Sequence, residues 1–176
     1  DAISELAERR DPSNKIEAEE FDDKHGNLKA ENNPGAANGK GIGFVSQGDY
    51  LVYNTLDFKG SNGASKVTIG YANNNSNTEI QLRLGSAEGP VVGTFKLAPT
   101  GSWTKFGTAT IDLDTPIEPS VVDLYVVFNN GSSNLDYIQF TEAEADIPSE
   151  EDIQAMKDAI AEAESYDAKN YEEESY

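Results

Sequence analysis

The chain has 176 residues, which suits one good-sized domain with a small extension, and it carries 13 Lys and Arg against 32 Asp and Glu. The resulting net charge of −19 disfavours nucleic acids and anionic membranes as partners, because both are held largely through Lys and Arg. The chain has no cysteine, which excludes disulfides, and a single histidine (His25), which argues against a Ser-His-Asp triad and a multi-histidine metal site. No apolar run approaches the ~20 residues of a membrane span, which argues against membrane insertion.

Residues 1–14 are predicted to form a short helix and linker that ends at the Asp-Pro turn of residues 11–12. Residues 1–15 have neither the basic start nor the apolar stretch of a signal peptide. We therefore expect this segment to follow an upstream part of a longer protein.

Residues 15–141 show the period-two pattern of β-strands. Ile80, Leu82 and Leu84 alternate with polar residues, as in a strand with one buried face. Similar runs separated by Gly, Asn and Ser turns occur at residues 67–72, 91–97, 108–113 and 123–128. Short strands at this spacing predict an all-β sandwich or barrel.

Residues 142–176 are predicted to form an acidic linker and a short amphipathic helix. Residues 141–176 hold 13 acidic and 2 basic residues, and Ser149 with Asp152 has the spacing of a capping box. Apolar residues then recur at helical spacing from Ile153 to Ala163. The segment 159–176 resembles the first half of the FIVAR repeat of bacterial secreted and surface proteins; the alternative is a solvated linker helix.

An acidic pair lies at the start of the predicted β-domain. In a strand, Glu17 and Glu19 would point to one face, about 7 Å apart, and would repel each other. A bound Ca²⁺, which prefers several oxygen ligands, would compensate for this repulsion. The alternative is a solvated acidic edge.

Two segments place polar or aromatic residues where an ordinary core strand would not. Trp103 directly follows a turn signal, which suggests a stacking platform, whereas a core indole would be expected within a strand. In the final predicted strand, Leu135 and Tyr137 would share one face, leaving Asp136 on the apolar side with Ile138. A cation is a natural partner for such an acid.

Four motifs occur in a recognisable order: IEAE (16–19), GFVSQGDYLVY (43–53), TGSW (100–103) and VVF followed by NLDYIQF (126–140). This order resembles that of a family 6 carbohydrate-binding module over about residues 15–140. The resemblance implies a β-sandwich of jelly-roll type, a structural Ca²⁺ and a non-catalytic, sugar-binding function.

The resemblance also implies individual roles. Glu17, Glu19 and Asp136 match metal ligands, and a backbone carbonyl near Lys40 would complete the set. Trp103 and Phe44 match the two rings that clamp a sugar, although Phe44 stands where a tyrosine or tryptophan is usual, and Asn134 matches the amide that bonds sugar hydroxyls. The alternative for either ring is a place in the core.

Three further residues are less clear. Tyr50 matches the aromatic of a second surface, on the concave face of the sheet, but ordinary sheet packing would explain it equally well. Glu31 could lend a carboxylate to the first site, although the variable loop 22–40 does not allow an assignment, and His25 in that loop is expected to be an exposed bystander.

We therefore expect a monomeric module that targets a secreted or cell-surface bacterial enzyme to a polysaccharide such as xylan or a β-glucan. Its partners would be that glycan and the catalytic domain of the parent protein. One alternative is a small glycoside hydrolase, which needs two carboxylates about 5–9.5 Å apart, a distance that some pair among 32 acids meets by chance. Another is an adhesion or spacer domain that has lost its cleft.

Overall fold

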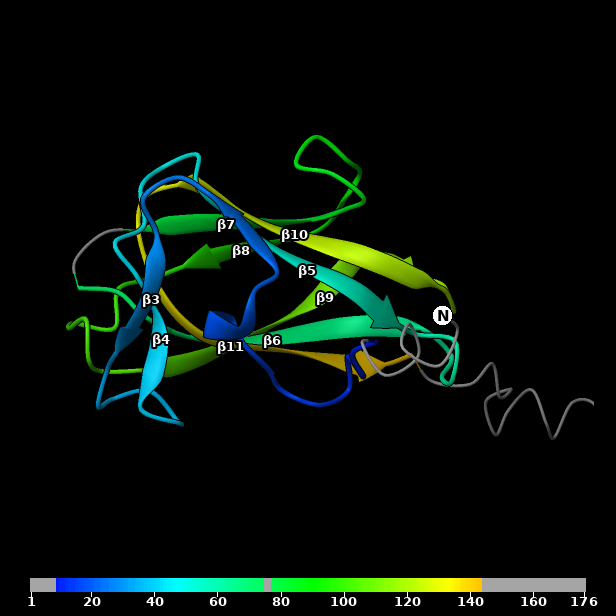
Figure 1. Cartoon of the computed structure of the whole chain (residues 1–176), viewed down its shortest axis with the longest axis horizontal. Helices are drawn as coiled ribbons and strands as arrows, with labels where there is room; N and C mark the ends of the chain where they lie inside the picture. Colours follow the sequence, from blue (N-terminus) through cyan, green and yellow to red (C-terminus); the bar gives the residue numbers. More distant parts are fainter. Residues whose placement is uncertain (1–8, 75–76, 144–176) are drawn as a thin grey trace, which may run out of the picture. The chain divides into compact units, whose positions relative to one another are not determined.

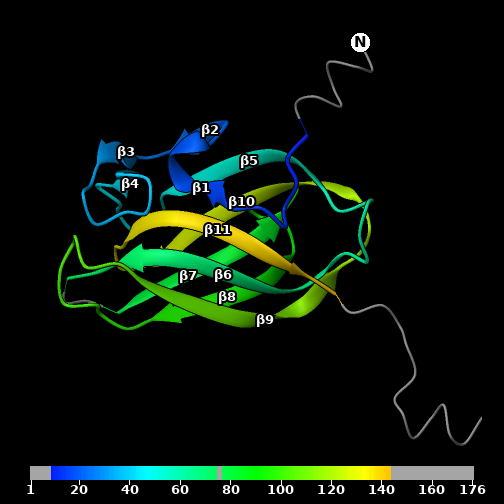
Figure 2. The same cartoon turned by 90° about the horizontal axis from the view of Figure 1, so that it is seen from below.

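The computed structural model describes residues 9–74 and 77–143, which form a sandwich of two antiparallel β-sheets (Figures 1 and 2). The first sheet consists of β1 (Ile16–Glu17), β3 (Lys29–Asn32), β4 (Lys40–Gly43), β6 (Ala64–Ala72), β9 (Gly107–Ile117) and β11 (Asn134–Glu142). Its order is β3-β4-β11-β6-β9, with β1 paired to β11.

The second sheet consists of β2 (Asp23–His25), β5 (Tyr50–Asp57), β7 (Thr78–Leu84), β8 (Val91–Leu97) and β10 (Val121–Asn130), in the order β2-β5-β10-β7-β8. The helical content of the described residues is one 3₁₀ turn, η1 (Ala18–Glu20). The predicted all-β jelly-roll sandwich is confirmed.

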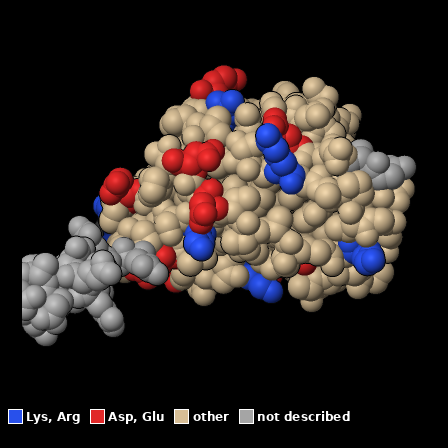
Figure 3. Space-filling view, turned by 180° about the vertical axis from the view of Figure 1, so that it is seen from behind, with Lys and Arg blue, Asp and Glu red and all other residues tan. Residues whose placement is uncertain are grey.

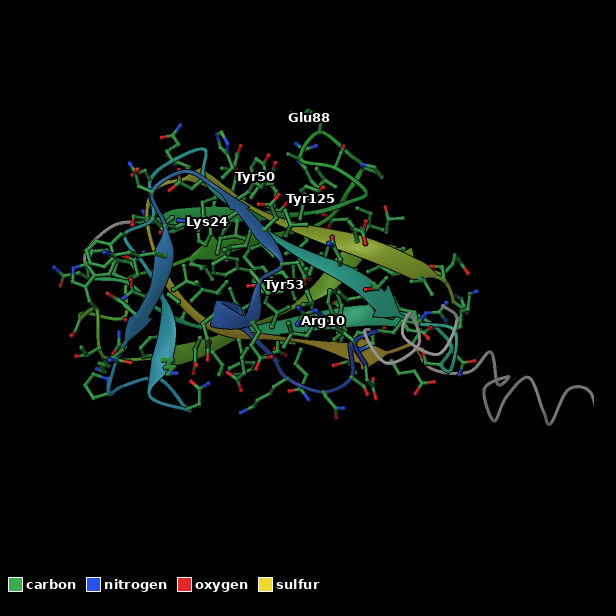
Figure 4. All side chains as sticks on the ribbon, in the orientation of Figure 1. Arg10, Lys24, Tyr50, Tyr53, Glu88 and Tyr125 are labelled. Atoms are coloured by element: carbon green, nitrogen blue, oxygen red, sulfur yellow. The ribbon has the colours of Figure 1, made fainter. Side chains whose placement is uncertain are left out.

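Alternating burial explains why these segments become strands. In β7, Ile80 and Leu82 are fully buried, whereas the intervening side chains face outward. In β5, Tyr53 lies between the layers and Tyr50 lies on the outer side of the sheet, together with Tyr125 of β10 (Figure 4). Each large apolar side chain buried between the sheets contributes roughly 1.5–3 kcal/mol to folding.

The structure departs from the predicted pattern around the paired glutamates. β1 ends at Glu17, and Glu19 belongs to η1, so the two residues do not share a strand face. The carbonyl of Ala18 accepts a 2.6 Å hydrogen bond from the buried Tyr53 hydroxyl. The expectation that the two glutamates share a strand face was wrong, because the strand ends at Glu17 and a side chain of β5, not a strand ladder, satisfies the Ala18 carbonyl.

A second departure is a β-bulge in β11. Leu135 pairs with Tyr71 and Tyr137 with Gly70, so Asp136 is one extra residue on this strand. Leu135 consequently packs in the core with Ile138, and Tyr137 lies outside this core cluster. The prediction that Leu135 and Tyr137 share a face was wrong, because period-two alternation carries no signal for an inserted residue.

The segment before β1 is bound to the sandwich. Arg10 forms a parallel bridge with Leu56, its amide donating to the carbonyl of Thr55, and the carbonyl of Pro12 accepts from the amide of Phe140. The predicted N-terminal helix, apart from residues 9–14, and the predicted helix after residue 143 lie outside the described residues. The domain boundaries at 14/15 and 141/142 stay predictions. Within the described ranges, no helix has the length and apolar character to cross a bilayer.

Candidate functional site

Two large hydrophobic side chains are exposed among the described residues, and both were predicted to bind sugar. Phe44, just after β4, is 59% exposed, and Trp103, in the loop between β8 and β9, is 40% exposed. Neither ring lies in the core. Both line one hollow of about 350 Å³, whose walls are formed by Glu31, Phe44, Trp103, Ser132 and Asn134. Exposed apolar rings gathered in one hollow are typical of a ligand-binding groove.

The backbone at Phe44 adopts an unusual conformation. Its φ is +60°, in the left-handed region that bulky residues rarely occupy. Strain of this kind is found at functional sites, where the surrounding structure imposes it. The ammonium of Lys29 lies 4.5 Å from the centre of the Phe44 ring, a cation–π contact, and Lys29 pairs with Gly43 in the β3–β4 hairpin.

The carboxylate of Glu31 in the wall of the hollow lies close to the Gly43 backbone. Glu31 and Gly43 lie on paired strands, and a Cβ at Gly43 would come within 2.3 Å of the Glu31 carboxylate. A larger residue at position 43 would therefore displace the Glu31 carboxylate from its place in the wall of the hollow.

Hydrogen bonds fix the loop that carries Trp103. The amides of Thr100 and Gly101 donate to the carbonyl of Asn73, at 2.8 and 3.0 Å. The carbonyl of Trp103 accepts from the side-chain amides of Asn33 at 3.0 Å and Asn134 at 2.8 Å. The indole is thus held in place through its backbone, which leaves the ring free to meet a ligand.

Asn134, the predicted hydrogen-bonding amide, is the first residue of β11 and is 5% exposed. One of its N–H groups is committed to the carbonyl of Trp103. The other N–H and the amide oxygen are left for a ligand in the hollow, and together they can donate to and accept from neighbouring hydroxyls.

Tyr50 lies apart from this hollow. It is half-buried on the outer face of the second sheet, where its ring stacks on His25 with centroids 5.0 Å apart and lies 5.8 Å from Tyr125. His25 is exposed as predicted, and its ring lies beside Tyr50 on this face.

Sequence reasoning missed Lys29, Asn33 and Ser132. The variable loop 22–40 carries no readable strand pattern, so the β3–β4 hairpin that brings Lys29 beside Phe44 could not be predicted. Ser132 gave no signal, since it lies in a polar turn like several others in the chain.

The predicted metal ligands form an acidic cluster at β1, η1 and the β11 bulge. Among the described residues, each of Glu17, Glu19 and Asp136 has one buried carboxylate oxygen without a hydrogen-bond partner. Burial, followed by repulsion from Glu19 and Asp136, raises the pKa of Glu17. Burial also raises the pKa of Asp136, although the amide of Ala37 donates to its other oxygen at 2.9 Å and opposes this shift.

Three orphaned carboxylate oxygens fit a hard cation, which replaces missing donors with its own charge. Within the described residues, however, no three acidic or histidine side chains are placed to hold a metal by themselves. Backbone carbonyls or water would have to complete the shell. Lys40, whose carbonyl was predicted as a ligand, is the first residue of β4 and has an exposed side chain.

A hollow of comparable size lies at the other end of β11. Its volume is about 380 Å³, and Glu142 lines it, whereas Asn134 at the start of the same strand lines the first hollow. Its two aromatic residues, Phe58 and Phe140, are buried. The residues that could stack on a ring-shaped ligand are therefore found only in the first hollow of these two.

The sequence model of the family described as Carbohydrate binding module (family 6) matches residues 17–142. The chain belongs to this family. It is a non-catalytic carbohydrate-binding module, as the sequence predicted.

The module is similar to Endo-1,4-beta-xylanase A of Thermoclostridium stercorarium, with 33% identity over 162 residues. That match covers 90% of this chain and 24% of the xylanase, and a second protein of that name is covered to 31%. The chain thus spans about a quarter to a third of these curated relatives.

Two solved structures resemble the module closely. The CsCBM6-3 module of Clostridium stercorarium, in complex with cellobiose, is 32% identical with a TM-score of 0.69, and the match covers 77% of this chain and 98% of that one. A family 6 module of Clostridium cellulolyticum, in complex with xylose, is 31% identical with a TM-score of 0.67, covering 76% of this chain and all of the other.

Proposed function

We propose that this module holds a secreted bacterial polysaccharide-degrading enzyme on its substrate, with xylan or a β-glucan as the glycan. The observation that carries the proposal is the pair of exposed rings, Phe44 and Trp103, lining one hollow beside the amide of Asn134. The similar proteins support this choice of glycan, because one is named a xylanase and the two structures hold cellobiose and xylose.

In this proposal the sugar is bound both by stacking on aromatic rings and by hydrogen bonds to an amide. The faces of a pyranose ring carry C–H groups that pack on Phe44 and Trp103, and Asn134 bonds the hydroxyls at the ring edge. Each hydroxyl exchanges a bond to water for one to protein, which nets only ~1 kcal/mol, so affinity for a single site is modest. Tethering still raises the effective concentration of glycan at a linked catalytic domain.

Surface charge is compatible with this ligand. On the face shown in Figure 3, charged side chains are scattered over a surface made mostly of other residues, with no broad basic patch. Neutral glycans need no such patch, whereas nucleic acids do.

The acidic cluster supports a structural Ca²⁺ as a further part of the proposal. Glu17, Glu19 and Asp136 would hold the ion, with the carbonyl of Lys40 as an additional ligand. The ion would tie β1 and η1 to β11 and neutralise three acids whose free oxygens are buried.

A second sugar surface at Tyr50 is also proposed. The half-buried ring, flanked by His25 and Tyr125, presents aromatic area on the outer face of the second sheet. Its use depends on a chain lying along the sheet, separately from the first hollow.

Affinity electrophoresis through soluble xylan, β-glucan and unrelated polysaccharides tests the proposal. Retardation by one glycan that is lost in Trp103→Ala and kept in Tyr50→Ala supports the hollow as the main site. Retardation lost only in Tyr50→Ala would move the function to the second sheet. No retardation in any gel would favour an adhesion or spacer domain, and release of reducing sugar would favour a hydrolase.

A further inference from the structure

The carbonyl of Trp103 is the point at which the sugar-binding loop is held. It accepts two amide hydrogen bonds, from Asn134 at 2.8 Å and from Asn33 at 3.0 Å. A carbonyl oxygen has two lone pairs, so both are used. Because the indole itself is 40% exposed, the position of the ring depends on how its backbone is held.

Asn33 is a buried polar residue whose side-chain oxygen and nitrogen both form hydrogen bonds. It directly follows β3 and is 4% exposed. Its side-chain oxygen accepts from the amide of Gly35 at 3.1 Å, which fixes the side-chain nitrogen toward Trp103. A buried amide is costly unless its groups are paired, so this arrangement explains why asparagine occupies an interior position.

The loop that begins at Asn33 packs tightly against the loop of Trp103. A Cβ at Gly35 would lie 1.8 Å from the carbonyl oxygen of Thr104, which leaves no space between the two backbones. The amide of Asn33 also donates to the carbonyl of Gly39 at 2.8 Å and closes the β3–β4 loop on itself. The contact to Trp103 therefore comes from a braced loop.

The two walls of the hollow meet through this residue. Phe44 follows β4, which pairs with β3 in the hairpin that Asn33 continues, and Trp103 lies on the separate β8–β9 loop. We propose that Asn33 is a positioning residue of the sugar site, setting the distance between the rings of Phe44 and Trp103 without touching the sugar. This inference rests on the proposed function of the hollow.

The substitution Asn33→Asp tests it with little change in volume. The aspartate keeps an acceptor for Gly35 but turns an oxygen toward the carbonyl of Trp103, where a donor is needed. The matched control is Asn32→Asp, which makes the same charge change at the neighbouring, exposed position on β3. Asn33→Ala removes the donor without adding charge, in case the aspartate prevents folding.

Three measurements are needed: titration calorimetry with xylohexaose and cellohexaose, the melting temperature, and the emission and acrylamide quenching of Trp103 without sugar. Trp103 is the only tryptophan, so its emission reports on this loop alone. We expect both Asn33 variants to bind about tenfold more weakly, a loss typical of one buried hydrogen bond, and to show altered emission and quenching. Asn32→Asp should match the wild type in both.

The variant Phe58→Leu distinguishes a positioning role of Asn33 from a general loss of stability. It is a core substitution at the opposite end of the sandwich, and it lowers stability without touching the hollow. The proposal is overturned if Asn33→Asp and Asn33→Ala keep wild-type affinity and emission, or if Phe58→Leu weakens binding as much as they do. If the wild type binds neither sugar, the proposed function fails instead, and the emission comparison between Asn33→Asp and Asn32→Asp still decides whether Asn33 positions the loop.

Discussion

Phe44 combines two features that oppose folding: a large apolar ring that is 59% exposed and a backbone φ of +60°. A side chain in the left-handed region costs roughly 1–2 kcal/mol compared with the right-handed one, and glycine avoids this cost. The fold would therefore be served better by glycine here. In the proposed function the ring serves binding, because Phe44 lines the hollow together with Trp103.

Comparing Phe44→Ala with Phe44→Gly tests whether the Phe44 backbone lowers stability while its ring contributes to binding. Both variants should lose most of the affinity for xylohexaose or cellohexaose, because the stacking ring is gone. Phe44→Gly should be more stable than Phe44→Ala by about 1 kcal/mol in urea unfolding, since only alanine retains the unfavourable φ. If alanine proved the more stable of the two, the residue would not occupy the left-handed region in solution.

β11 carries both proposed sites on one strand. Asn134 at its start lines the hollow, and Asp136 at the bulge joins the acidic cluster two residues later. The bulge makes this possible, because it removes Asp136 from the alternation that places Leu135 and Ile138 in the core.

The calcium dependence of stability tests the proposed metal site between β1, η1 and β11. Folding raises the pKa of Glu17 and Asp136, mainly by burial, so without a cation both groups bind protons more tightly in the folded chain. Their contribution to stability therefore falls as pH rises from the usual carboxyl range of about 4 through the raised values. Ca²⁺ needs these carboxylates ionised and binds the folded chain, so its stabilisation should grow over the same range.

The measurement is the melting temperature in calcium and in EDTA from about pH 4 to 7, after unfolding and refolding in EDTA to release a slowly leaving ion. The gap should reach several degrees near neutral pH and shrink in acid. Glu17→Gln should reduce the gap, whereas sugar affinity should change little while the chain remains folded. Equal melting temperatures at neutral pH would contradict a cation site.

The sequence could reveal the features that depend on neighbouring residues, but not those that depend on contacts between residues far apart in the chain. The strand of Ile80 and Leu82 was predictable, because alternation is a local pattern. Trp103 was recognisable from its turn and its motif. Asn33 was not, because its role comes from a contact with a residue 70 positions away. The bulge at Asp136 was equally hidden, since it is visible only when β11 is paired with β6.

At the scale of the whole molecule, the proposed sugar site and the ends of the described chain lie apart. The amide of Ala143 donates to the carbonyl of Gly63, and Arg9 pairs with Asp57 at 3.5 Å. Gly63 and Asp57 line the hollow at the Glu142 end of β11, whereas Asn134 lines the sugar site at its start. Arg9 and Ala143, at the two ends of the described chain, thus lie beside that second hollow and not beside Phe44 and Trp103.

Removing the residues before Arg9 and after Ala143 should leave binding intact. The described residues 9–74 and 77–143 belong to one compact unit, and every residue of the proposed sugar site is among them. A shortened chain of residues 9–143 should bind xylohexaose or cellohexaose within twofold of the full chain in titration calorimetry. A loss of tenfold or more would show that residues outside this range contribute to the site.

The proposed function requires that a sugar binds against the indole of Trp103. The most direct measurement is the emission of this single tryptophan during a titration with xylohexaose and cellohexaose, run alongside calorimetry. We predict a saturable change in emission for at least one of the two sugars, with the same dissociation constant as the heat signal. Saturable heat with unchanged Trp103 emission would place the sugar elsewhere on the module and contradict the account.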